Sequence, residues 1–518
     1  MKLVTSEQMR ALDQRTIEEF GTPGALLMER AGQGVALVVA QLGELTGRLG
    51  CVRCVAGRGN NGGDVFVAAR CLHEMGWPVE LALAGEAGEL RGDARLHFER
   101  MLEAGVEPVT FDQIGGLPPR DIEATRELVV EGILGTGISG APRGDAEAAI
   151  RRVNQLGAQR PVVAVDVPSG LNSDSGAAAG AVVRADVTVT IGLPKTGLVA
   201  SQARELVGTV EVIDIGIPVD YTAGLPADTG LITADDLRPL FPRRARVSHK
   251  GTYGHVLLIG GSREYSGAIS MAAMSAVRSG AGLVTVLTPA ATAACVTALV
   301  PEAMVYPAPA CDDGALTATA MQAWSHPLSD FDAVMIGPGL TRTEGAQRLA
   351  QSVLTSCPVP LVVDADALPD AAQIDILKQA AGPLVLTPHP GEMARLRGCD
   401  VATVQSNRRQ TARDVAAQTG ATVILKGCGT VVAQPDGTAF INATGNPGMA
   451  CGGMGDVLAG LLTGLLAQGL PPFEAAQAAV YLHGRAADRA AWQGAQASLK
   501  ASDVVEALPP AFRELSVS

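Results

Sequence analysis

The sequence predicts an α/β protein of two domains, each built on an open, largely parallel sheet with helices on both faces. Three observations lead to this fold class. The chain has 518 residues, which is too long for one ordinary compact core. Short apolar runs typical of strands alternate with helix-like stretches through both halves. Aromatic residues make up only 3%, while 61 glycines suit close helix packing and backbone that approaches a ligand directly.

In the first half, two helical stretches precede the first strand. The segment SEQMRALDQRTIEEFG offers Ser6 as N-cap and Gly21 as stop. Residues 24–42 continue as a helix rich in apolar and small residues, which could flank the site or form a subunit interface. Strand-like runs follow at 51–57, 78–85, 127–135, 161–169, 185–192 and 210–216, with helix-like stretches between them at 63–75, 90–104 and 144–157. Ligands of such sheets bind beyond the carboxyl ends of the strands.

Around residues 216–250 the pattern changes, because turn formers, prolines and basic residues gather there. We place the domain boundary near residue 225, which gives domains of 1–225 and 226–518. The alternation then restarts, with strand-like runs at 254–261, 282–289, 331–339, 360–368, 383–392, 421–427 and 429–437.

Composition argues against several classes of protein. A net charge of −13 is unlike that of a general binder of nucleic acid or anionic membranes, so we expect neither partner. No apolar run is long enough to span a bilayer, and the start of the chain lacks the apolar core of a signal peptide. Cys51 and Cys54 have a CxxC spacing inside a strand-like run, which favours buried small hydrophobes over a metal or redox site. We expect a cytoplasmic protein.

The segment GRGNNGGDVFVAAR, residues 57–70, is the first motif that indicates chemistry. It follows a strand and opens a helix, so its glycines let the backbone turn sharply and its amides can hold phosphate. It matches neither the dinucleotide fingerprint nor the P-loop. The alternative is a structural Asn-Gly turn in which Asp64 stabilises the helix start.

Two further strand ends supply polar companions to this turn. EGILGTGISG places Glu131 on a strand and Gly135 to Gly137 at its exit, and DVPSG places Asp166 and Ser169 at another exit. Oxygen atoms that converge there could bind a monovalent cation or orient a substrate, and Asp166 could transfer protons. Each motif alone is equally consistent with a strand-end turn.

With SEQMRALD, GALLMERAG and GLPKTG, these motifs resemble the NAD(P)HX epimerase family, also called the YjeF N-terminal domain, over roughly residues 1–220. The resemblance implies a Rossmann-like three-layer domain that epimerises hydrated NADH and NADPH. It implies potassium ligands at Asn61, Glu131 and Ser169. The family usually has Asp at the position of Glu131 and often has Thr at the position of Ser169. Lys195 is a further charged candidate for the pocket. The implied hydrate-binding residues are Asn60, Asn61, Gly62, Gly63, Asp64, Gly135, Thr136, Gly137, Ile138, Ser139, Gly140, Ala141 and Asp166.

The densest motif of the second half is NATGNPGMACGGMGDVLAGLLTGLLAQG. Small residues from Gly452 to Gly455 expose successive amides at a helix start, where they can stabilise a developing phosphate charge. Asp456 follows and could accept the proton of a hydroxyl that attacks the phosphate. The alternative is that Asp456 only stabilises the helix N-terminus.

This motif resembles the GxGD signature of the ribokinase-like fold, which is also a three-layer fold. Seven blocks over residues 230–510 resemble the ADP/ATP-dependent NAD(P)HX dehydratase family. They are HKGTYGHVLLIGGSREYSGA, RSGAGLVTVLTP, IGPGL, VDADAL, LTPHPGEMARL, LKGCGTVV and NPGMACGGMGDVLAG. The resemblance implies magnesium and ADP or ATP as co-substrate, with hydrate contacts from Ala268, Gly339, His389 and Asp456. It implies nucleotide contacts from Lys426, Gly427, Cys428, Gly429, Thr430 and Gly455.

Several positions depart from that family or allow a second interpretation. Met454 stands where Ser or Thr is usual, and Thr341 stands where a glycine often follows GPGL. His389 lies between two prolines and could be a turn residue. Asp364 and Asp366 at a strand end could act near magnesium and phosphate or could be ordinary caps.

The sequence therefore predicts a bifunctional enzyme that repairs hydrated nicotinamide cofactors. Two alternatives stay open at this point. GxGD alone also permits a kinase of small molecules such as a sugar, hydroxymethylpyrimidine or thiazole. The first domain could also be an inactive binding module. We expect a homo-oligomer, because the helix at 24–42 is rich in small residues.

Overall fold

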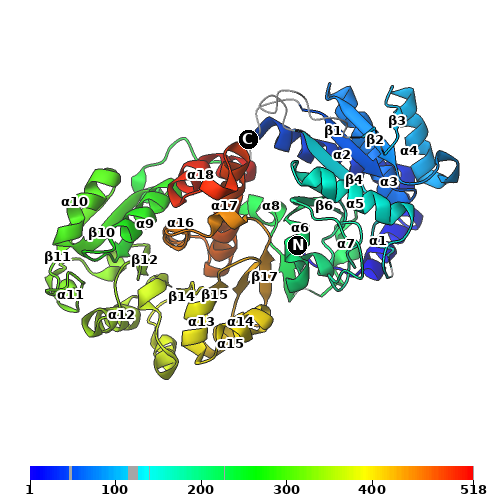
Figure 1. Cartoon of the computed structure of the whole chain (residues 1–518). Coiled ribbons are helices and arrows are strands. Elements are labelled where there is room, and N and C mark those ends of the chain that lie inside the picture. Colours follow the sequence, from blue (N-terminus) through cyan, green and yellow to red (C-terminus); the bar gives the residue numbers. More distant parts are fainter. Residues whose placement is uncertain (46–49, 112, 115–126, 139, 227, 517–518) are drawn as a thin grey trace. The chain divides into compact units, whose positions relative to one another are not determined.

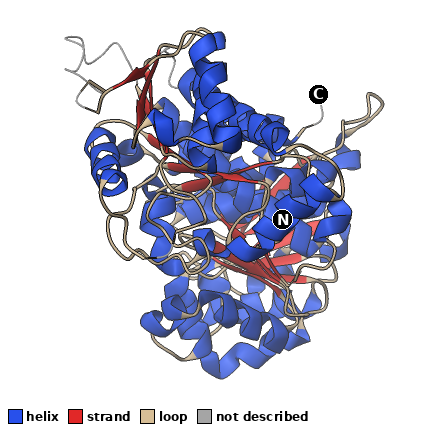
Figure 2. Cartoon of the chain, turned by 90° about the vertical axis from the view of Figure 1, so that its right-hand side faces the viewer, coloured by secondary structure: helices blue, strands red, loops and turns tan. Residues whose placement is uncertain are grey.

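The computed structural model describes residues 1–518 except 46–49, 112, 115–126, 139, 227 and 517–518. It divides into two compact units, unit 1 at Met1–Ala227 and unit 2 at Asp228–Ser518 (Figure 1). The division lies beside the boundary near residue 225 that the sequence predicts. Helices and strands alternate along both units, and Figure 2 shows the two kinds of element, so both units are α/β.

Unit 1 contains a seven-stranded sheet in the order β3-β2-β1-β4-β5-β6-β7, and every pairing in it is parallel. The order turns back between β1 and β4, which places a crevice at their carboxyl ends. β3 has only two residues, too few to show a pattern in the sequence. The strands are β1 Val52–Ala56, β2 Val79–Leu83, β3 Pro108–Val109, β4 Leu128–Gly132, β5 Val162–Val165, β6 Val187–Ile191 and β7 Thr209–Ile213.

The helices of unit 1 include α2 (Gly24–Leu45), which packs against α3 (Asn60–Glu74). A Cβ at Gly32 would lie 2.6 Å from the Asp64 carbonyl oxygen, so α2 approaches α3 as closely as glycine permits. The small residues of α2 therefore pack within the unit. The remaining helices are α1 Ser6–Glu18, α4 Gly92–Glu103, α5 Asp145–Gly157, α6 Arg204–Val207 and α7 Val219–Thr222.

The first helix begins one residue earlier than the sequence analysis predicts. Thr5 is the N-cap of α1, because its hydroxyl accepts from the Gln8 amide while the Gln8 side chain accepts from the Thr5 amide. The prediction of Ser6 as N-cap was wrong, since the Ser6 hydroxyl donates instead to Asp174 at 2.9 Å. Gly21, with φ +80°, follows the end of the helix in the left-handed region that favours glycine.

Unit 2 contains a ten-stranded sheet in the order β11-β10-β9-β12-β13-β14-β15-β16-β17-β8. Its pairings are parallel from β11 to β15, whereas β16 runs antiparallel to both of its neighbours. The strands are β8 Thr229–Leu231, β9 His255–Ile259, β10 Leu283–Pro289, β11 Met304–Ala308, β12 Ala333–Ile336, β13 Leu361–Val363, β14 Leu384–Leu386, β15 Thr422–Leu425, β16 Thr430–Ala433 and β17 Ala439–Asn442.

Two hydrophobic cores flank this sheet, one built largely on helices α9, α16, α17 and α18 and the other on α12, α13 and α15. Helix α16 is apolar on all sides because it packs against α9, α17 and the sheet. A Cβ at Gly460 would lie 2.0 Å from the Ala272 carbonyl oxygen, which explains the small residues along this helix. No helix in the described part of the chain combines the length and apolarity needed to cross a membrane.

The helices of unit 2 are α8 Ala234–Leu237, α9 Ser266–Arg278, α10 Ala290–Leu299, α11 Thr319–Ala323, α12 Glu344–Ser356, α13 Pro390–Arg397, α14 Val401–Ser406, α15 Arg408–Thr419, α16 Met454–Ala467, α17 Pro472–Gln493 and α18 Ala501–Leu515.

Candidate functional site

The glycine-rich turn of unit 1 lies between β1 and α3, at the carboxyl end of the sheet. A Cβ at Gly62 would lie 1.9 Å from the Gly57 carbonyl oxygen, and a Cβ at Gly57 would lie 1.9 Å from the Ile133 carbonyl oxygen. Because backbone fills these spaces, larger side chains cannot be accommodated without a backbone shift. Gly59, by contrast, faces open space.

Asn61 joins this turn to two other strand ends. Its side-chain amide donates to the carbonyl oxygens of Leu134 and Val165, each at 3.0 Å. Gly135 lies against Asn61, since a Cβ there would be 3.4 Å from the Asn61 Cβ. The structure thus brings together the first three motifs that the sequence singled out. Gly63 and Asp64 are buried in α3, while Asn60 is exposed.

The predicted cation ligands Glu131 and Ser169 are also in contact. The Ser169 hydroxyl donates to Glu131 Oε2 at 2.6 Å, and the Ser169 amide donates to Oε1 at 2.9 Å. The same hydroxyl lies 3.1 Å from the Leu134 carbonyl oxygen, which also accepts from Asn61. Burial raises the pKa of Glu131 to about 7, although its hydrogen bonds lower it.

The loop after β4 contributes the rest of the predicted hydrate-binding segment. Gly137 and Gly140 face open space, and Gly140 has a φ of +91°. Thr136 precedes Gly137 and Ile138 follows it, and Ala141 is the last residue of the segment. Ser139 lies outside the described residues.

Asp166, at the exit of β5, is held in a strained backbone conformation with a φ of +65°. Its Oδ1 accepts from the Ile191 amide at 3.2 Å, from the Thr190 hydroxyl at 3.3 Å and from the Lys195 ammonium. Lys195 is 1% exposed and also donates to the Ile191 carbonyl oxygen at 2.7 Å. Asp166 and Lys195 thus form an ion pair at the exit of β5.

Two more carboxyl groups lie within electrostatic reach of this ion pair. Asp13 comes from α1, and burial raises its pKa to about 6 with Lys195 opposing the shift. Burial also raises the pKa of Asp64, and the nearby Asp166 and Asp13 raise it further. Asp13 lies in SEQMRALD but could not be recognised as a site residue from the sequence, because nothing local links α1 to Asp166.

The second site is the N-terminus of α16 in unit 2. Gly453 is the N-cap with a φ of +92°, so the amides of residues 453–455 begin the helix. Met454 is buried in the hydrophobic core, which explains why an apolar side chain is tolerated between the glycines. Burial raises the pKa of Asp456 to about 7, with Asp364 adding to the shift and Lys426 opposing it.

Lys426, at the exit of β15, links the predicted nucleotide segment to the glycine turn. Its ammonium donates to Asp364 at 2.8 Å and lies 3.8 Å from Glu392. A Cβ at Gly455 would be 3.3 Å from the Lys426 nitrogen. Asp364 is buried and also accepts from the Thr387 hydroxyl at 2.6 Å. This cation therefore lies at the glycine-rich start of α16, where a phosphate would carry negative charge.

Two buried residues hold these loops in place and were not recognised in the sequence. Arg408 on α15 donates to the carbonyl oxygens of Leu425 at 2.8 Å and Lys426 at 3.0 Å. Asp488 on α17 accepts from the Gly445 amide at 2.8 Å and the Asn446 side chain at 3.0 Å. Both contacts join segments far apart in the chain, so no local pattern announces them. The residues Gly427, Cys428, Gly429 and Thr430 follow the segment that Arg408 holds.

The predicted hydrate contacts of unit 2 lie at neighbouring strand ends. A Cβ at Gly339 would lie 3.3 Å from the Ala268 Cβ, so these two residues are adjacent. Thr341 adopts a φ of +69°, which accounts for the glycine often found there. His389 is the N-cap of α13, and its Nδ1 accepts from the amides of Gly391 at 3.0 Å and Glu392 at 3.2 Å. His389 therefore has the turn role left open from the sequence, and its side chain stays 57% exposed.

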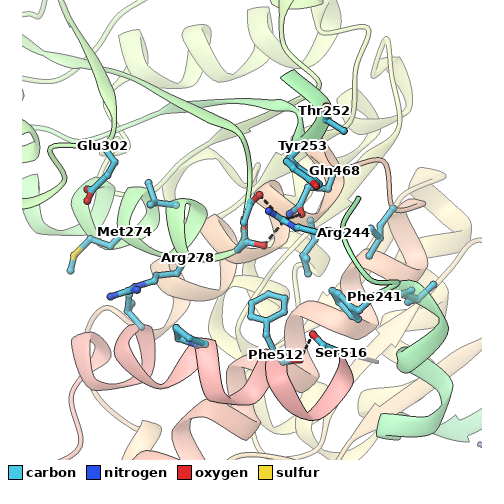
Figure 3. A pocket seen from close by; sticks show the side chains of 18 of the residues that line it. Phe241, Arg244, Thr252, Tyr253, Met274, Arg278, Glu302, Gln468, Phe512 and Ser516 are labelled. Atoms are coloured by element: carbon cyan, nitrogen blue, oxygen red, sulfur yellow. Dashed lines mark hydrogen bonds between the residues drawn. The ribbon is translucent and has the colours of Figure 1, made fainter. Parts of the chain in front are cut away.

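A separate cavity of about 1040 Å³ lies at the other end of α16, and Figure 3 shows its lining. Arg244 stacks on Tyr253 with 3.8 Å from its guanidinium carbon to the ring centroid, and donates to Gln468 and the Gly280 carbonyl oxygen at 2.8 Å. Phe512 also lines this cavity. None of the predicted site residues does, so the cavity is distinct from the start of α16.

Together, the fold and the two sites define a two-domain α/β protein in which each unit gathers acidic residues and a lysine at the carboxyl ends of its strands, beside a glycine-rich helix start. The family model described as "YjeF-related protein N-terminus" matches residues 24–197, and the model "NAD(P)H-hydrate dehydratase" matches residues 256–510. The bifunctional NAD(P)H-hydrate repair enzyme Nnr of Moorella thermoacetica is 42% identical over 99% of this chain and 97% of its own length. The enzyme of the same name from Escherichia coli is 36% identical over 97% and 92%. The chain therefore belongs to the family of bifunctional NAD(P)H-hydrate repair enzymes.

Among solved structures, unit 2 is similar to one titled as the ADP/ATP-dependent NAD(P)H-hydrate dehydratase of Bacillus subtilis, co-crystallised with ATP and Mg²⁺. The match has 34% identity and a TM-score of 0.48, and it covers 55% of this chain and 98% of the other. Family membership favours cofactor repair over the alternative of a small-molecule kinase.

Proposed function

We propose that unit 1 interconverts the R and S hydrates of NADH and NADPH, and that unit 2 dehydrates the S hydrate at the expense of ADP or ATP. The observation that carries this proposal is the pair of aspartates, Asp166 and Asp456, each placed beside a glycine-rich helix start at the carboxyl ends of a parallel sheet. Family membership supplies the substrates. An epimerase on the same chain would let both hydrates be recovered.

In unit 2, the chemistry has to turn a poor leaving group into a good one. The hydrate carries a hydroxyl on the carbon beside the ring nitrogen. Phosphorylation of that hydroxyl lets the nitrogen lone pair expel phosphate and restore the dihydropyridine. We assign Asp456 to accept the hydroxyl proton, and the amides of residues 453–455 to stabilise the transferred phosphoryl group. A pKa of Asp456 near 7 suits a general base that works at neutral pH.

Binding roles follow from the same placement. We assign Ala268, Gly339 and His389 to contact the hydrate, and Gly455 with residues 426–430 to hold the nucleotide. Lys426 supports this assignment because its buried ammonium lies beside Gly455.

When bound, magnesium would offset charge on the nucleotide phosphates. Of the two acidic residues that follow β13, Asp366 fits this role better than Asp364. Within the described residues its Oδ2 accepts only the Thr341 amide, at 3.0 Å, whereas Asp364 Oδ1 accepts from Lys426 and Thr387.

In unit 1, we assign Asp166 as the base that takes the proton of the hydroxyl on the carbon to be epimerised. The Lys195 ammonium engages Oδ1, whereas Oδ2 accepts no hydrogen bond within the described residues. We assign residues 60–64 and 135–141 to surround the hydrate. The open glycines of the second segment leave room for a ligand.

We also propose that Asn61, Glu131 and Ser169 hold potassium. The donor set fits, because all three side chains carry oxygen. Ser169 joins them, since its hydroxyl contacts Glu131 and also the Leu134 carbonyl oxygen that accepts from Asn61. A bound monovalent cation would order the three strand ends around the hydrate.

We further expect a homo-oligomer in a cytoplasmic setting. Light scattering during size-exclusion chromatography tests the first expectation, and a single-chain mass in solution would contradict it. Fractionation of the source cells tests the second, and recovery of the protein outside the cytoplasmic fraction would contradict it.

The two substitutions Asp166→Asn and Asp456→Asn in the full chain test the assignment of activities. Asp166→Asn should abolish R-to-S exchange and leave dehydration of the S hydrate unchanged. Asp456→Asn should do the reverse while nucleotide still binds. If either variant kept its own activity at the wild-type rate, the assignment of that aspartate would be wrong.

A further inference from the structure

The N-terminal segment is fastened to the part of unit 1 that carries Lys195. The Val4 amide donates to the Pro194 carbonyl oxygen at 3.0 Å, and the Thr196 amide donates to the Val4 carbonyl oxygen at 2.9 Å. This pairing brackets Lys195. Beyond it, Ser6 donates to Asp174, so the start of α1 is fixed at a second point.

The same docking carries Asp13 toward the ion pair. Leu12, its neighbour, packs with Met9 and Leu193 in a small hydrophobic cluster. Asp13 Oδ1 is buried and accepts no hydrogen bond within the described residues. A buried carboxylate oxygen without a donor is costly, whereas a protonated carboxyl bears that burial at much lower cost.

The carboxyl groups around Lys195 therefore differ in the hydrogen-bond donors that they receive. Asp166 Oδ1 accepts hydrogen bonds from the Lys195 ammonium and from the Ile191 amide. Asp13 receives no donor to its buried oxygen, and burial raises the pKa of Asp13 to about 6. Asp64, from α3, also faces this pair and is buried. Asp13 and Asp166 thus both interact electrostatically with Lys195 but differ in the donors that they receive. Two carboxyl groups in such unlike environments can serve as acid and base.

We propose that Asp13 is the general acid that works with the Asp166 base in epimerisation. This role rests on the epimerase function proposed above for unit 1. Asp166 removes the proton of the hydrate hydroxyl, whose oxygen then forms a carbonyl with the ring carbon. The bond from that carbon to the ring nitrogen breaks, its electron pair stays on nitrogen, and Asp13 gives its proton to that nitrogen.

The ring-opened form is an aldehyde that carries an enamine N–H. Rotation about the adjoining carbon–carbon bond presents the other face of the aldehyde to the nitrogen. Closure reverses each step: nitrogen attacks the carbonyl carbon, Asp13 recovers its proton, and Asp166 returns the other proton to oxygen. No water, oxidant or other reactant is consumed, and both aspartates end as they began.

The test measures R-to-S exchange by the full chain without nucleotide, so that the dehydratase is idle, with the two hydrates separated by chromatography. The wild type must first show exchange, because its failure would overturn the epimerase function and not the role of Asp13. Asp13→Asn should then lower kcat by about 100-fold or more, the usual contribution of a general acid, and leave KM within about threefold. Asp13→Glu should recover at least a tenth of the wild-type rate.

A pH profile separates an acid from a merely structural residue. The wild-type rate should fall as rising pH removes the proton from the acid, and the residual rate of Asp13→Asn should lack this fall. The same fall in the variant would transfer the role to another group, Asp64 first, and overturn the proposal.

Two controls complete the design. Glu18→Gln removes a charge from the exposed end of α1 and should leave exchange unchanged. Dehydration of the S hydrate by the same preparations checks that the chain is intact. Exchange by Asp13→Asn within about threefold of the wild type would refute the proposal. If that variant failed to fold, Asp13→Glu and the wild-type profile would decide, since a wild-type rate without an alkaline fall would also refute it.

Discussion

The buried carboxylate of Asp456 should lower the free energy of unfolding of unit 2 at neutral pH. Its pKa is raised from 3.8 to about 7, chiefly by burial. The folded unit therefore binds this proton more tightly than the unfolded chain, so the penalty begins as pH rises through about 4 and is nearly complete above about pH 7. At about 1.4 kcal/mol for each tenfold difference in proton affinity, the penalty approaches about 4 kcal/mol at pH 8 and about 0.5 kcal/mol at pH 4.

Asp456→Asn removes the charge and keeps the shape, so the variant should be inactive as a dehydratase and more stable. We expect its free energy of unfolding to exceed that of the wild type by a margin that grows from pH 4 to pH 7 and then levels. Pulse proteolysis in urea, with fragments of unit 2 followed separately, measures this margin. Asp313→Asn, at an exposed turn of the same unit, is the matched control and should show no such margin.

A margin independent of pH, or a variant that loses stability as pH rises, would refute this reasoning. Either result would mean that Asp456 is not held with a raised pKa in the folded unit, and its role as a base near neutrality would lose its physical support.

Three further predictions follow from the two sites. The dehydratase kcat should rise with pH and level above about pH 8, with about a tenth of the plateau at pH 6, because Asp456 must be ionised to act. A flat profile from pH 5 to 8 would contradict this. Gly62→Ala forces a Cβ against the Gly57 carbonyl oxygen and should lower the epimerase kcat/KM about 100-fold or more. Gly59→Ala is the control and should leave kcat/KM unchanged, because Gly59 faces open space. Equal activities of the two variants would be inconsistent with the geometry. Arg408→Leu removes hydrogen bonds worth about 1.5–3 kcal/mol each from the backbone of the nucleotide segment. The variant should raise the nucleotide KM by about tenfold or more and leave epimerisation unchanged. A KM within twofold of the wild type would count against this.

Much of the fold could be predicted because strand and helix alternate plainly in this sequence. The central strands are short and apolar, and glycines follow several of them, such as β1, β9 and β12, so the sequence predicts their positions and the glycine turns correctly. The edges were harder. β11 contains Pro307 and is largely exposed, so it lacks the apolar run of a buried strand. The antiparallel direction of β16 depends on its partners β15 and β17 and not on its own residues.

The candidate sites divide in the same way. Residues at strand exits, such as Asp166 and Lys426, lie where the topology places ligands, so a motif and its position were enough to single them out. Asp13, Arg408 and Asp488 escaped notice, because each acts on a segment distant in the chain and is itself an unremarkable polar residue of a helix. Met454 could be recognised as unusual from the sequence, but only its burial explains why it is tolerated.

The most direct test of the account is the recovery of absorbance at the reduced-nicotinamide band from a mixture of R and S hydrates. Purified full-length protein is supplied with magnesium, potassium and either ADP or ATP. We predict nucleotide-dependent recovery of the whole mixture, which requires both activities on this chain. Recovery that stops at the S fraction would contradict the epimerase function of unit 1, and no recovery with either nucleotide would contradict the dehydratase function of unit 2.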